Sequence, residues 1–141
     1  MREILFKAKS VYDGEWVEGY YIRDQYHIGG KDIIFYRKDS DRFTVYTNII
    51  DIETLCQFTG LCDKNGNKIW ENDIFQYTDE TMVAQRDLIE FNANHASFVR
   101  LHNTEKLGLQ YLWIDEATCN HGEVIGNIFD NKELLQEESD E

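Results

Sequence analysis

A chain of 141 residues with 42% hydrophobic and 13% aromatic side chains can bury a core without disulfides, and this composition excludes a disordered protein. Its 27 acidic and 14 basic residues give a net charge of −13, which argues against direct binding to nucleic-acid phosphates. The three cysteines allow at most one disulfide bond, and the charged first residues lack the apolar core of a signal peptide. We therefore expect a cytoplasmic protein that binds neither nucleic acid directly nor a membrane.

Strand and turn signals alternate through the first 54 residues. Strands are predicted at 4–8, 16–22, 32–37 and 42–50. Asp13-Gly14 and Gly29-Gly30 separate the first three strands, because these residue types accept the left-handed backbone of tight hairpin turns. This spacing predicts an N-terminal β lobe over residues 1–54, of the barrel or sandwich type.

The remaining residues, 55–141, are predicted to form a second, barrel-like β lobe with a closing helix and an acidic tail. Short strands are expected at 56–61, 68–70, 73–77, 82–91, 97–101, 109–114 and 124–129, although the pattern at 82–91 also suits a helical turn. Asn131 is predicted to cap a helix over 131–137. The predicted fold class is therefore mainly β, a β-rich α+β arrangement of two small barrel- or sandwich-like lobes with a short C-terminal helix.

The segment 57–75 carries the most specific pattern in the chain, QFTGLCDKNGNKIWENDIF. It resembles the hallmark of the YopX family, small proteins of bacteriophages and prophages. The opening residues 1–20 and the closing residues 124–135, VIGNIFDNKELL, are similar to the matching parts of that family. The resemblance implies a phage or prophage origin, a β-rich fold and self-association. It implies no established activity, cofactor or catalytic residue.

The residue chemistry of this segment favours a structural role. Asn65-Gly66 predicts a tight turn, and Gly60 is expected to supply an unusual backbone angle. Asn72 stands where the family has Gly, and Asn is among the residues next best able to adopt a left-handed conformation. The alternative is a ligand or partner site formed by three neighbouring side chains: Trp70, Glu71 and Asp73.

Metal and catalytic chemistry finds little support in the sequence. Counted from Asp63, a calcium loop of the EF-hand type would have Lys68 at position 6 and Ile74 at position 12, where Gly and Glu are required. Cys56 and Cys62 are separated by five residues, more than the usual spacing of zinc ligands. We expect no metal site, no cofactor and no catalytic residue.

The tyrosines of the N-terminal region are candidates for a binding surface. Tyr20, Tyr36 and Tyr46 lie on predicted strands, and strand alternation buries only about half of such residues on one face. The others would cover a second subunit or a partner, since aromatic residues are enriched at the centres of interfaces. Packing within the chain is the alternative for the same residues.

Together these features favour a non-enzymatic interaction or assembly module that forms homo-oligomers in the cytoplasm of a bacterial host cell. Its acidic surface would steer it toward a basic host protein, including one that binds nucleic acid. The alternative is a small ligand-binding or enzymatic β-barrel protein with a site between the two lobes. That site would be assembled from Asp73, His95, His102 and His121.

Overall fold

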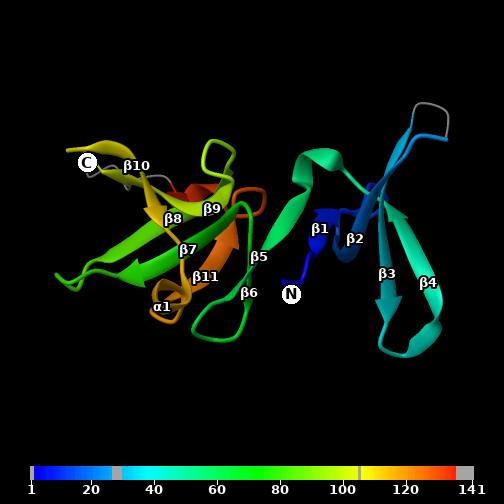
Figure 1. The fold of residues 1–141 in the computed structure, drawn as a ribbon, viewed down its shortest axis with the longest axis horizontal. Coiled ribbons are helices and arrows are strands. Elements are labelled where there is room, and N and C mark those ends of the chain that lie inside the picture. Colours follow the sequence, from blue (N-terminus) through cyan, green and yellow to red (C-terminus); the bar gives the residue numbers. More distant parts are fainter. Residues whose placement is uncertain (1, 27–29, 105, 136–141) are drawn as a thin grey trace. The chain divides into compact units, whose positions relative to one another are not determined.

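The computed structural model describes residues 2–26, 30–104 and 106–135. Strands dominate these residues, and the helices among them are short (Figure 1). The prediction of a mainly β fold is confirmed: the chain forms two antiparallel sheets with little helix. The polypeptide divides into two compact units, Met1–Phe58 and Thr59–Glu141, which we call the first and second units.

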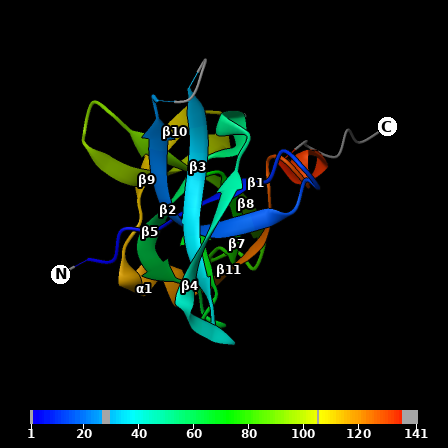
Figure 2. The same ribbon diagram turned by 90° about the vertical axis from the view of Figure 1, so that its right-hand side faces the viewer.

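The first sheet has the strand order β4-β3-β2-β1-β5-β6. Its strands are β1 (Phe6–Lys9), β2 (Trp16–Asp24), β3 (Lys31–Lys38), β4 (Asp41–Ile49), β5 (Cys56–Cys62) and β6 (Lys68–Trp70). A 3-10 turn, η1 (Ile52–Thr54), precedes β5, and β5 itself carries the chain across the boundary between the units. Figure 2 shows β3 lying between β2 and β4.

The core of the first unit lies on one face of its strands. Ala8, Ile34 and Ile50 are buried there, and Val17 and Tyr21 pack against them. Successive side chains of a strand point to opposite faces, so the neighbours of these residues along each strand lie on the other face of the sheet. The first unit is therefore a sheet with one covered face.

The second sheet has the order β10-β9-β8-β7-β11. Its strands are β7 (Asp73–Thr78), β8 (Ala84–Asn92), β9 (Ser97–Thr104), β10 (Gly108–Trp113) and β11 (Gly122–Asn127). Ile69, Phe75, Ile89 and Cys119 form its buried core. The sheets are not closed into a barrel, so the barrel-like form expected of the second lobe is corrected to an open sheet with β10 and β11 at its edges.

The helical predictions also need correction. The helix expected over 131–137 is a 3-10 turn, η2 (Lys132–Leu135), and residues 136–141 lie outside the described part of the chain. The Asn131 side chain, the predicted cap, accepts a hydrogen bond from the Asn127 N–H upstream at 3.3 Å. A short helix, α1 (Glu116–Cys119), was not predicted. Among the described residues, no helix is both long and apolar enough to cross a membrane.

Candidate functional site

The uncovered face of the first sheet carries apolar side chains from three strands, which we call the outer face: Tyr20, Ile22, Ile33, Phe35, Val45 and Ile49. Tyr20 lies directly opposite Phe35, and Ile22 lies opposite Ile33. Directly opposed residues of an antiparallel pair share a face of the sheet. Tyr20 is 64% exposed, and Ile22 and Val45 are also exposed. An exposed set of this kind is typical of a binding surface.

A groove of about 490 Å³ lies on the outer face. Tyr20, Phe35 and Val45 line it, and Glu18 and Arg37 add one charge of each sign. Pockets of roughly 300–1,000 Å³ accept small ligands, and apolar walls also suit a side chain of another protein. The groove thus gives the outer face a shape into which a partner can insert.

The three tyrosines predicted as a binding surface divide between the two faces of the sheet. Tyr20 lies on the outer face, whereas Tyr36 packs against the core of the first unit and also lines the groove. Tyr46 lies directly opposite Tyr36, and their stacked rings have centroids 5.6 Å apart. The structure therefore brings Tyr20 and Tyr36 to one groove. Tyr46 stacks on Tyr36 and does not line the groove.

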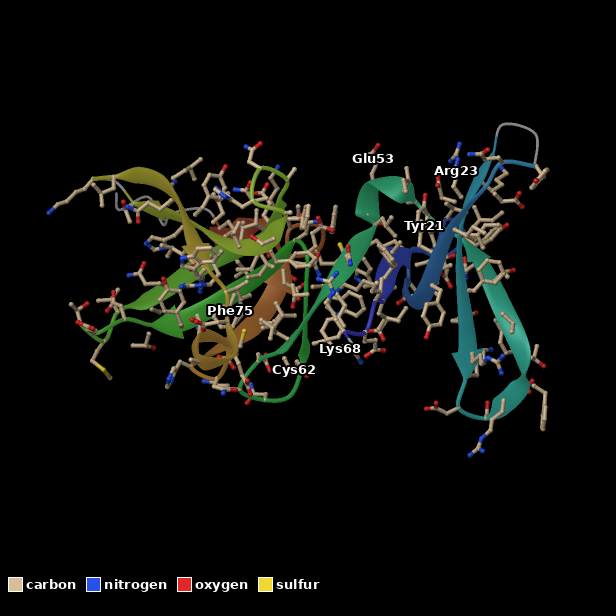
Figure 3. All side chains as sticks on the ribbon, in the orientation of Figure 1. Tyr21, Arg23, Glu53, Cys62, Lys68 and Phe75 are labelled. Carbon is tan, nitrogen blue, oxygen red and sulfur yellow. The ribbon has the colours of Figure 1, made fainter. Side chains whose placement is uncertain are left out.

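A buried carboxylate, that of Asp32, lies near the start of β3 in the same sheet. Asp32 is buried, and it accepts hydrogen bonds from the Tyr21 hydroxyl and from Arg23 Nη1, both at 2.6 Å. Burial, together with the neighbouring Asp32 carboxylate, raises the pKa of Tyr21. Figure 3 shows Tyr21 and Arg23 projecting from the same strand. Because both carboxylate oxygens of Asp32 accept hydrogen bonds, we infer that Asp32, Tyr21 and Arg23 stabilise the sheet.

The turn of the second unit between β5 and β6 is organised by one carboxylate. Asp63 is buried, and its Oδ1 accepts the N–H groups of Asn65 and Asn67, each at 2.9 Å. Its Oδ2 accepts the N–H of Val124 at 2.9 Å. Burial acts to raise the pKa of Asp63, but these N–H bonds outweigh burial and hold that pKa below its ordinary value. Gly66 has φ +81°, as the predicted tight turn requires.

The predicted site residues Trp70 and Asp73 are buried in the second unit, and Glu71 is half-buried. Asp73 Oδ2 accepts the backbone N–H of Trp70 at 2.8 Å. Asn72, between them, has φ +71°, the left-handed conformation expected where the resemblance places Gly. Such burial leaves the indole and the carboxylate little surface for a ligand, which favours a structural role for this stretch.

A buried polar cluster on the core face of the second sheet was not predicted. Asp87 is fully buried, and its Oδ2 accepts a hydrogen bond from Arg100 Nη1 at 2.9 Å. Its Oδ1 lies 2.6 Å from His102 Nδ1. Arg100 also donates to the carbonyl oxygen of Trp113 at 2.8 Å and lies over the ring of Tyr77. Burial, followed by the charge of Asp87, raises the pKa of Tyr77.

Two of the residues proposed for an enzymatic site bond to different partners, and the other two lie in exposed turns. Asp73 caps the backbone three residues upstream, and His102 belongs to the cluster around Asp87. His95 is exposed in the turn between β8 and β9, and His121 is exposed after α1. Across residues 2–26, 30–104 and 106–135, no group of three or more His, Cys, Asp or Glu side chains is placed to hold a metal ion.

Comparison with known proteins identifies the family. The family described as YopX protein matches residues 5–136, most of the chain. The chain belongs to the YopX family. Its fold is similar to that of protein EF1440 from Enterococcus faecalis, known from a crystal structure, with a TM-score of 0.53. The two share 23% sequence identity over 96% of this chain and 100% of that one. None of the curated proteins compared with the chain matches it.

The segment with the strongest YopX resemblance, residues 57–75, contains turns that are held by carboxylate–backbone hydrogen bonds. Gly60 and Gly66 have positive φ angles, and Asn72 takes the same backbone region. Asp63 accepts the backbone N–H of Asn67, just before β6, and Asp73 accepts that of Trp70, the last residue of β6. The YopX resemblance therefore rests largely on residues that set the fold, while the outer face lies in the other unit.

Proposed function

We propose that this YopX-family protein is a non-enzymatic interaction and assembly module of a phage or prophage, acting in the cytoplasm of the bacterial host. It associates with a second copy of itself through the outer face of the first sheet. Its acidic second unit is directed at a basic host protein. The observation that carries the proposal is an exposed apolar face, with a groove, on a unit whose charges nearly balance.

The two units differ strongly in charge. Residues 1–58 contain eight basic and ten acidic residues, a net charge of −2, whereas residues 59–141 contain six and 17, a net charge of −11. Two copies that meet through their first units bring little like charge together, so repulsion does not oppose the contact. Aromatic and aliphatic side chains at the centre of such a contact supply its free energy.

The acidic second unit supports a basic partner. A net charge of −11 on residues 59–141 accelerates association with positively charged surfaces and disfavours acidic ones. Proteins that bind nucleic acid carry such basic surfaces. A host nucleic-acid-binding protein is therefore the partner class that we propose for this unit.

Self-association is tested by sedimentation velocity across a concentration series. The wild-type protein is expected to exceed the mass of one chain, and the double variant Tyr20→Lys/Val45→Lys is expected to sediment as a monomer. Met82→Lys is the matched control, since Met82 is an exposed apolar residue of the second unit. A wild-type protein that is monomeric at every concentration, or a double variant that still assembles, would contradict this part of the proposal.

The basic partner is tested separately by affinity capture from host cytoplasm at increasing salt concentrations. Capture that depends on the acidic unit should weaken steeply with salt, because ions screen exposed charges. A captured protein of acidic composition, or capture that salt leaves unchanged, would exclude the electrostatic partner without affecting the test of self-association.

A further inference from the structure

Strand β10, Gly108–Trp113, forms an open edge of the second sheet and carries exposed apolar side chains. Among the described residues it pairs with β9 and no other strand. Leu109, Tyr111 and Trp113 alternate along it and share one face, with Tyr111 58% and Trp113 76% exposed. An open strand edge with exposed apolar residues readily accepts another strand.

A small hollow adjoins the end of β10. Trp113 pairs with Val99, whereas β9 begins at Ser97, so β9 extends two residues past the end of β10. The hollow, about 140 Å³, is lined by His95, Ser97, Val99, Tyr111, Leu112 and Trp113. Its volume is below the roughly 300–1,000 Å³ of small-ligand pockets and suits one inserted side chain.

One residue that lines this hollow, Ser97, carries an unpartnered hydroxyl. Ser97 Oγ is buried and has no hydrogen-bond partner among the described residues. A buried polar group without a partner costs free energy, and a hydrogen-bond donor from a bound molecule removes that cost. The hollow therefore favours a side chain that carries N–H donors over a purely apolar one.

A carboxylate on the same face of the sheet, that of Glu90, favours the same kind of side chain. Val99 lies opposite Glu90 on β8 and opposite Trp113 on β10, so these three residues share a face of the sheet. The second unit has a net charge of −11, and aromatic rings attract cations over their faces. A guanidinium group combines a positive charge with several N–H donors and a plane that stacks on aromatic rings.

We propose that β10 and the adjoining hollow bind an extended peptide segment that carries arginine at alternate positions. The segment adds to the sheet as a strand beside β10, one arginine enters the hollow and donates to Ser97 Oγ, and its guanidinium stacks on Trp113. This inference deepens the proposed function, since it assigns the site for the basic partner. It does not depend on self-association through the outer face.

The test is isothermal titration calorimetry of the full-length protein with a synthetic ten-residue peptide that alternates arginine and threonine. Trp113→Ala is expected to weaken binding about tenfold, as loss of one aromatic–guanidinium contact predicts. Ser97→Ala is expected to weaken it about threefold, as loss of one hydrogen bond predicts. Tyr12→Ala, which removes a 74% exposed aromatic residue from the first unit, is the matched control and should bind as wild type.

Two further peptides separate this site from general attraction of a polycation to an acidic protein. Replacing every arginine with glutamate should abolish binding, and methylating alternate backbone nitrogens should weaken it by blocking strand addition. General attraction would instead leave the affinity unchanged by Trp113→Ala, Ser97→Ala and backbone methylation, and that result would overturn the inference. Tyr20→Lys/Val45→Lys should bind the arginine peptide as wild type does, even if it abolishes self-association, so failure of one proposal is distinguishable from failure of the other.

Discussion

Asp87 and His102 face each other across strands β8 and β9, with 2.6 Å between the Asp87 Oδ1 and the His102 Nδ1. Arg100 engages the second carboxylate oxygen of Asp87 at 2.9 Å. The Asp87 side chain is fully buried, so its carboxyl oxygens are satisfied by protein groups and not by bulk water. The core face of the second sheet is therefore polar where β8 meets β9. We expect substitutions of these polar residues to change the stability of the fold strongly.

Removing Arg100 is therefore expected to destabilise the fold strongly. A buried charge that loses its partner costs about 3–5 kcal/mol, and Arg100→Met should lower the free energy of unfolding in urea by that amount. The double variant Asp87→Leu/Arg100→Met should recover part of the loss, because paired replacement by apolar side chains is often neutral, but His102 then loses its Asp87 partner. Arg86→Met, which alters an exposed arginine on the same sheet, serves as control and should cost less than about 1 kcal/mol. Equal losses of unfolding free energy for Arg100→Met and Arg86→Met would show that the buried Asp87–Arg100 pair contributes no more to stability than an exposed arginine does.

The lowered pKa of Asp63 makes the stability of the folded protein depend on pH. Its folded-state pKa is depressed, so the stability that it contributes is present above the unfolded pKa of about 3.9 and is lost as pH falls through the folded value. Asp63→Asn should cost about 1–3 kcal/mol at neutral pH, because the amide turns a donor toward the Val124 N–H. The difference from wild type should shrink in unfolding experiments below about pH 4. A difference that stays constant with pH would refute this role.

The three cysteines should differ in reactivity. All three are free, but Cys56 and Cys119 are buried whereas Cys62 is exposed. Burial, reinforced by the charge of Asp115, raises the pKa of Cys119 to about 11, so its reactive thiolate is scarce at neutral pH. Iodoacetamide followed by peptide mass spectrometry should modify Cys62 in the native protein and the other two after unfolding. Modification of native Cys119 at the rate of Cys62 would contradict the burial of that thiol.

Gly122 is required by its contact with Phe75. A Cβ atom at position 122 would overlap the Phe75 ring and crowd the carbonyl oxygen of Gln76. Overpacking of this kind costs about 1–3 kcal/mol, which thermal or urea unfolding of Gly122→Ala should detect. In a Phe75→Leu background the same substitution should cost less, since the smaller side chain leaves room. Additive costs in the double variant would exclude the ring contact as the cause.

Local patterns sufficed to predict most strands. Alternating apolar residues and Gly- or Asn-containing turns depend on neighbours in the chain, so β7, β8 and β9 were predicted near their observed positions. Asn72 was expected to adopt a left-handed conformation, and it does. The short helix α1 was missed, although Asp115 caps it through the Thr118 N–H, because four residues give too little periodicity for a helix.

The sequence by itself determined the β-rich class, the family and the turns, because these follow from residue types that act within a few positions of one another. Only the tertiary structure decided which side chains meet. Cross-strand register joined Asp87 to His102, buried Trp70 and Asp73, and left Tyr20 and Trp113 exposed on different units. Register depends on contacts between residues distant in the chain, and a period of two residues says that alternate side chains share a face without saying which face is covered.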